Sequence, residues 1–88
     1  MLRITRADAS ATGVSLRVEG RLTHPGLQRL RESCAELLES GTSVQLDLSG
    51  LQFADRDAVV TLRALRRRGV SLHGASGFVE ALLADPHP

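Results

Sequence analysis

The sequence predicts an α/β fold: a small mixed β-sheet with helices mainly on one face. Short segments alternate apolar and polar residues, the period of a strand with one buried face, whereas longer segments space their apolar residues as helices do. The two kinds of segment alternate between residues 14 and 72, an order typical of parallel strands joined by helices. Because the strands are not apolar throughout, the other face of the sheet is expected to be open. Its side chains would be those of Arg3, Thr5, Ser15, Arg17, Gln45, Asp47, Ser71 and His73.

The first two elements are predicted to be antiparallel strands. Residues 2–5 alternate, residues 7–13 are small and polar and predict a turn, and residues 14–19 alternate again. Residues 20–22 interrupt this alternation, which indicates a bulge or a short extension of the second strand.

A helix is expected next. Thr23 or His24 stands at its capping position, and Pro25 follows in the first turn, where a missing N–H costs nothing. Gly41 marks its end. The apolar stripe of this helix consists of Leu27, Leu30, Cys34, Leu37 and Leu38.

The strongest pattern lies in residues 43–69, where a strand is followed by a helix. Residues 44–48 alternate, and Leu51 and Phe53 continue the alternation across a short link. Asp55 then stands where a helix cap is expected, because its carboxylate can accept from free N–H groups of the first turn. Asp57 adds a negative charge at the positive end of the helix dipole.

The C-terminal part predicts a last strand and a third helix. The second helix has the stripe Val59, Leu62 and Leu65 and ends at Gly69, and residues 70–73 then alternate as a strand. The third helix is predicted from Phe78, Val79, Leu82 and Leu83 and stops at Pro86.

These segments together resemble the STAS domain, the SpoIIAA-like fold of bacterial anti-sigma factor antagonists. The resemblance is carried by the strand at 44–48 with Ser49-Gly50 after it, by Phe53-Ala54-Asp55 before the helix, and by the run from Arg68 to Leu72. It implies a signalling protein that regulates transcription through protein–protein interaction. The length of 88 residues fits one such domain over residues 1–88, and the single cysteine, Cys34, fits a reducing cytoplasm.

One position departs from the family pattern. In phosphorylatable STAS antagonists, the residue after the Phe-x-Asp aspartate is a Ser or Thr that a partner kinase modifies, whereas this chain has Arg56 there. No hydroxyl lies between Leu51 and Val60, and Thr61 is one turn too far along the helix. We therefore expect no phosphorylation switch at this position.

The candidate site is a protein-binding patch at the start of the second helix. Asp55, Arg56 and Asp57 would make polar contacts, supported by Leu51 and Phe53. The resemblance implies a partner such as an anti-sigma factor, which is a kinase-like protein. Binding would be constitutive or controlled by the partner. The alternative for these charged residues is helix capping alone.

Two other functions stay open. As in STAS-like small proteins, the chain would be an accessory subunit of an ABC-type lipid transporter, with the transporter ATPase as its partner. Alternatively, it would sense a small molecule or nucleotide at the loop around Asp55, although no glycine-rich phosphate loop supports this.

The composition argues against several classes of protein. A net charge of +1, two Phe, and no Tyr or Trp disfavour nucleic-acid binding, so the arginines at 63 and 66–68 are interpreted as a solvated helix end. The chain has no apolar run long enough to insert into a membrane, and its N-terminus predicts a strand rather than a signal peptide.

Nothing in the sequence predicts an enzyme. The carboxylates of Asp55 and Asp57 lack a nucleophile or metal ligands nearby, so we expect no catalytic residue, metal or cofactor. Cys34 is interpreted as a core residue. STAS domains usually continue with a further strand and helix, so an open sheet edge or helix groove is expected here, which a homodimer or a partner would cover.

Overall fold

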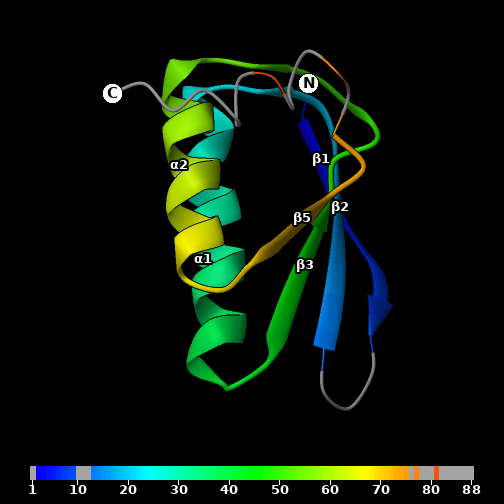
Figure 1. The fold of residues 1–88 in the computed structure, drawn as a ribbon, viewed down its shortest axis with the longest axis vertical. Coiled ribbons are helices and arrows are strands. Elements are labelled where there is room, and N and C mark those ends of the chain that lie inside the picture. Colours follow the sequence, from blue (N-terminus) through cyan, green and yellow to red (C-terminus); the bar gives the residue numbers. More distant parts are fainter. Residues whose placement is uncertain (1, 10–12, 76, 78–80, 82–88) are drawn as a thin grey trace.

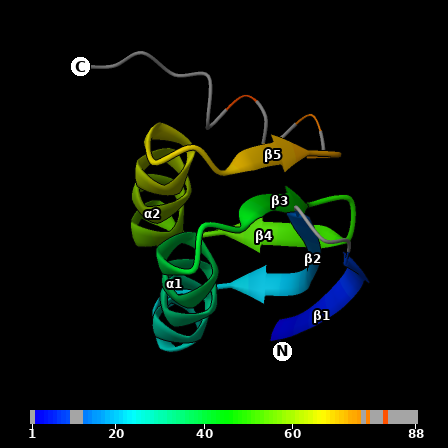
Figure 2. The same ribbon diagram turned by 90° about the horizontal axis from the view of Figure 1, so that it is seen from below.

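The computed structural model describes residues 2–9, 13–75, 77 and 81. In these residues a five-stranded sheet carries two helices on one face, as Figures 1 and 2 show. The elements are β1 (Leu2–Ala9), β2 (Gly13–Leu22), α1 (His24–Glu39), β3 (Ser43–Asp47), β4 (Leu51–Ala54), α2 (Arg56–Arg67) and β5 (Ser71–His73). The predicted mixed α/β fold is confirmed.

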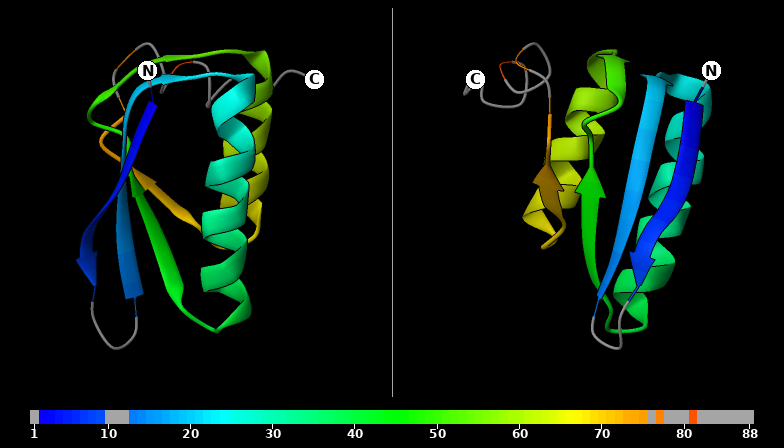
Figure 3. Two further views of the ribbon diagram at one scale, coloured as in Figure 1. Left: turned by 180° about the vertical axis from the view of Figure 1, so that it is seen from behind. Right: turned by 90° about the vertical axis from the view of Figure 1, so that its right-hand side faces the viewer.

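The sheet has the strand order β1-β2-β3-β5 (Figure 3), and β4 also pairs with β2. Only β1 runs antiparallel to its neighbour β2; the other pairs are parallel. β3 pairs with residues 13–17 of β2 and β4 with residues 20–22, so the two short strands follow one another along one edge of β2. The register shifts between Gly20 and Arg21, where Gly20 has a φ of 95°. The predicted bulge is confirmed, and the strand extends to Leu22.

Two predicted connections are strands instead. The turn predicted at residues 7–13 is wrong for Ala7–Ala9, which belong to β1, because Asp8 and Ala9 pair with Ser15 and Val14 through their backbones. The short link at Leu51 and Phe53 is the strand β4. In both places backbone pairing with β2 decides the conformation, and at Ala7–Ala9 it does so without an apolar stripe.

The core lies between the sheet and the two helices. The stripe predicted for α1 is buried at Leu27, Leu30 and Cys34 and partly buried at Leu37 and Leu38. On the opposite face of the sheet, the eight predicted polar side chains are exposed or half-buried, so the prediction of an open polar face is confirmed. The third helix was predicted from Phe78, Val79, Leu82 and Leu83, which lie outside the described residues.

The connections bring the two helix starts to one end of the molecule. β2 leads into α1 and β4 leads into α2, and these strands are parallel. Figure 1 accordingly shows both helices beginning at the same end of the molecule. In open α/β sheets, this end, beyond the carboxyl ends of the parallel strands, is where ligands most often bind.

Candidate functional site

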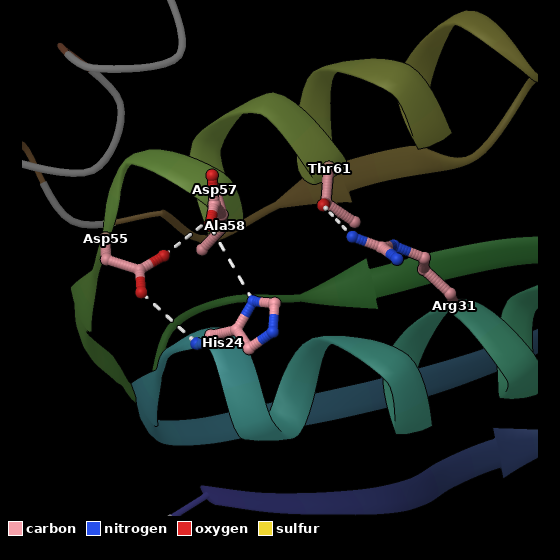
Figure 4. Close-up of polar contacts among 6 residues, drawn as sticks. All are labelled: His24, Arg31, Asp55, Asp57, Ala58 and Thr61. Atoms are coloured by element: carbon pink, nitrogen blue, oxygen red, sulfur yellow. Dashed lines mark hydrogen bonds and ion pairs between the residues drawn. The ribbon is translucent and has the colours of Figure 1, made fainter.

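The carboxylate of Asp55 joins the starts of both helices. Its Oδ1 atom accepts a hydrogen bond from the backbone N–H of Ala58 at 2.8 Å, which caps α2 as predicted. Its Oδ2 atom accepts from the backbone N–H of His24 at 3.2 Å, in the first turn of α1 (Figure 4). One side chain therefore satisfies free N–H groups of two helices, and its negative charge lies at the positive ends of both dipoles.

The cap of α1 differs from the prediction. Thr23 is the N-cap residue with extended backbone, but its side chain makes no capping hydrogen bond. The prediction of Thr23 as the N-cap residue is therefore confirmed, but the prediction that Thr23 or His24 supplies the capping side chain is wrong. The side-chain acceptor comes from Asp55, because the fold places the two helix starts side by side.

Arg56 and Asp57 project from the first turn of α2 into solvent. Both residues are exposed. The Oδ2 atom of Asp57 lies 3.7 Å from Nδ1 of His24, an ion pair when the imidazole is protonated; the two side chains are 66% and 81% exposed. Contacts between groups this exposed add little stability, so the fold does not depend on the ion pair between Asp57 and His24.

The predicted supporting residues lie beneath this surface. Leu51 is 2% exposed and belongs to the core, so it positions β4 and has no free surface for a partner. Phe53 is half-buried, and the guanidinium of Arg21 lies 4.4 Å from the centre of its ring. This cation–π contact joins β4 to β2 two residues before the α2 cap Asp55.

Thr61 does not replace the missing hydroxyl at position 56. It is 7% exposed, and its Oγ1 atom accepts a hydrogen bond from Nη2 of Arg31 at 3.4 Å. A kinase would need this hydroxyl to be exposed. The contact instead joins α2 to α1, as Figure 4 shows.

Cavities, possible metal ligands and helix length bear on other kinds of site. Two shallow cavities of about 310 and 340 Å³ lie beside α1 and β1, and none of Asp55, Arg56 and Asp57 lines either. Within the described residues, no group of three or more His, Cys, Asp or Glu side chains could hold a metal ion. In the same part of the chain, neither helix is both long and apolar enough to cross a membrane.

The α2 cap was predictable from the sequence, whereas two contacts of the site were not. These are the bond between Asp55 and the His24 N–H and the contact between Arg21 and Phe53. Both join residues about thirty positions apart. For the contact between Arg21 and Phe53, the sequence shows only that each residue lies next to an apolar strand position. This does not predict that the two residues are neighbours.

Comparison with known proteins gives a family match and two similar folds. A family model described as "Mlab, STAS domain" matches residues 5–85. The structure of SpoIIAA, an anti-sigma factor antagonist in its unphosphorylated form, has a TM-score of 0.73 at 14% identity and covers 93% of this chain and 80% of its own. A STAS domain of an antisigma-factor antagonist from Rhodobacter sphaeroides has a TM-score of 0.62 at 24% identity, covering 86% and 92%. No curated protein sequence matches.

Proposed function

The chain belongs to the STAS domain family, and we propose that it is a non-enzymatic protein-binding module, similar to anti-sigma factor antagonists, whose contact surface is the start of α2. The polar contacts come from Arg56 and Asp57, and Asp55 holds them in place. Leu51 and Phe53 support the surface from below.

The observation that supports this proposal is the division of roles among the three charged residues. Asp55 uses both carboxylate oxygens within the molecule. Arg56 and Asp57 are exposed beside it, at the end of the sheet where ligands of α/β folds most often bind. Capping alone therefore explains Asp55 but gives no role to Arg56, since a positive charge is unfavourable near a helix N-terminus.

Arg56 also bears on regulation. The position has no hydroxyl to phosphorylate, and its charge is positive where a phosphate would be negative. Binding at this surface is then constitutive or controlled by the state of the partner. The chain would act in the bacterial cytoplasm, in signalling that regulates transcription.

The test is a pull-down with a charge-swapped variant, Arg56→Glu with Asp57→Lys. The variant leaves Asp55 in place, because replacing that residue would disturb both helices. A matched control is Arg6→Glu with Asp8→Lys, which makes the same exchange two residues apart on exposed positions of β1. We expect the wild type and the control to retain one bound protein that the helix-start variant loses, with all three showing the same circular dichroism spectrum.

The identity of the captured protein separates the candidate functions. An anti-sigma factor or kinase-like protein supports the proposal, whereas a transporter ATPase supports the role of an accessory subunit. Capture that survives the helix-start variant would contradict the proposed surface. Sedimentation of the purified chain tests the homodimer, and a ligand screen by thermal shift tests the sensor, since a bound ligand raises the melting temperature.

A further inference from the structure

The exposed side of α2 carries a line of residues that the fold does not use. Arg56, Val60, Ala64 and Arg67 are all exposed and follow one another at spacings of four, four and three residues, so they form one stripe along the helix. We name these four residues the outer α2 stripe. It begins at the candidate site and runs along the whole helix.

Val60 is the unusual member of this stripe. It is 59% exposed, the one exposed large hydrophobic side chain among the residues that the structure describes. Its helix neighbours Thr61 and Leu62 face the core of this chain, whereas Val60 points away from it. Val60 could therefore be buried only by another molecule. Ala64, one turn further, is small enough to let another backbone approach closely.

Charge surrounds this apolar spot. Residues 56–68 contain five of the eleven arginines of the chain and one acidic residue, Asp57. The chain as a whole has a net charge of only +1, so positive charge is concentrated on this helix. A surface of this kind attracts acidic partners and repels basic ones.

We propose that the outer α2 stripe binds an acidic amphipathic helix of the partner protein. An aliphatic side chain of that helix packs on Val60 and Ala64, and carboxylates on either side pair with Arg56 and Arg67. The stripe is about 16 Å long at 1.5 Å per residue, which is the length of three turns of a partner helix. This inference rests on the proposed function and specifies the chemistry of the partner.

The test uses the full chain, labelled for NMR, and blocked 16-residue peptides. The probe is an amphipathic helix with leucines in one stripe and glutamates on both sides of it. One control peptide has Lys for every Glu, and another has Ala for every Leu. We expect the acidic leucine peptide to shift amide signals of α2 and both controls to shift none, with binding weakened severalfold between low salt and about 0.5 M salt.

Variants of the chain then identify the contacts. Val60→Thr keeps the branched shape but removes apolar surface, and Val60→Asp adds a charge that repels the peptide. We expect about tenfold weaker binding for Val60→Asp and severalfold weaker binding for Val60→Thr and Arg67→Glu. The control is Arg6→Glu, an exposed arginine of β1, which should bind as the wild type does.

Several results would overturn the inference. These are no binding of the acidic peptide, equal binding of the lysine peptide, or shifts confined to the open face of the sheet. Binding of a DNA duplex or anionic lipid vesicles that Val60→Asp leaves intact would also overturn it, because the arginines would then act as a general anionic-ligand surface.

The same variants separate this inference from the proposed function when a protein partner is captured. If Arg56→Glu with Asp57→Lys loses the partner while Val60→Asp and Arg67→Glu retain it, the helix start is the site and the outer α2 stripe is not. If all of them retain the partner, both proposals fail.

Discussion

The backbone N–H of His24 donates a hydrogen bond to Oδ2 of Asp55 at 3.2 Å, although the two residues lie 31 positions apart. The other oxygen of the same carboxylate accepts from Ala58. Asp55 is therefore a shared cap that holds the starts of α1 and α2 together (Figure 4). This fixes the place from which Arg56 and Asp57 project.

Removing the shared cap should destabilise the fold more than removing an ordinary first-turn charge. We expect Asp55→Ala to lower the free energy of unfolding by about 2 kcal/mol, the upper range for an N-cap, because N–H groups of two helices lose their acceptor. Asp55→Asn should lose less, because its amide oxygen can still cap α2. Urea unfolding followed by circular dichroism measures both.

The matched control for this prediction is Asp57→Ala. Asp57 is exposed in the same turn and makes only the 3.7 Å contact with His24, so its loss should cost about 0.5 kcal/mol. Equal losses at the two positions would mean that the shared cap adds nothing beyond an ordinary first-turn charge.

The contact between Arg21 and Phe53 should be measurable as a coupling energy. In a double-mutant cycle with Arg21→Gln and Phe53→Leu, we expect a coupling of about 0.5–1 kcal/mol in the free energy of unfolding, the usual size for a cation–π pair near the surface. A second cycle pairs Phe53→Leu with Arg3→Gln, an exposed arginine of β1, and should show no coupling. Equal coupling in both cycles would argue for a general charge effect.

Asp47 should make stability fall in acid. The backbone N–H of Ser49, 3.0 Å from Oδ1, and the Ser49 hydroxyl hold the pKa of Asp47 below its usual range, with a smaller effect of Arg17. Because the folded pKa lies below the unfolded one, this stabilisation is present at neutral pH and is lost as pH falls through the folded pKa.

To test this, the melting temperatures of the wild type and of Asp47→Asn are compared at neutral pH and in acid. The variant should be less stable at neutral pH, and the difference should shrink as pH falls below about 4, the usual carboxyl pKa of Asp. A constant difference over this range would show that Asp47 acts without its charge. Arg17→Gln serves as a milder control, because it removes only the 3.4 Å contact.

Cys34 should be unreactive in the folded protein. Burial raises the pKa of its thiol to about 11, against an opposing effect of Arg68, and the side chain is fully buried. At pH 8 we expect iodoacetamide to label it far more slowly in the native state than in urea, since the thiolate is the nucleophile. Because the unfolded thiol ionises first, stability should also fall as pH rises from about 9 toward 11. Rapid native labelling would contradict this burial.

The elements with regular side-chain periods were predictable from sequence, and the irregular ones were not. The stripe from Leu27 to Cys34 and the cap at Asp55 depend on residues within one or two turns, so local spacing was sufficient to predict them. Residues 7–9 have no such period, and the alternation of Leu51 and Phe53 in β4 is too short to distinguish a strand from a link. They become strands because β2 offers backbone partners there.

Local sequence thus determines that this chain has one buried face on each strand, two stripe-bearing helices and a charged, capped start to α2, because capping and amphipathicity act over a few residues. The tertiary structure decides which distant groups share a contact: Asp55 with the start of α1, Arg21 with Phe53, and Arg31 with Thr61. It also decides that Val60 is exposed while Thr61 is buried. The reason is geometric, since parallel β-α connections bring both helix starts to one end and turn one side of α2 away from the sheet.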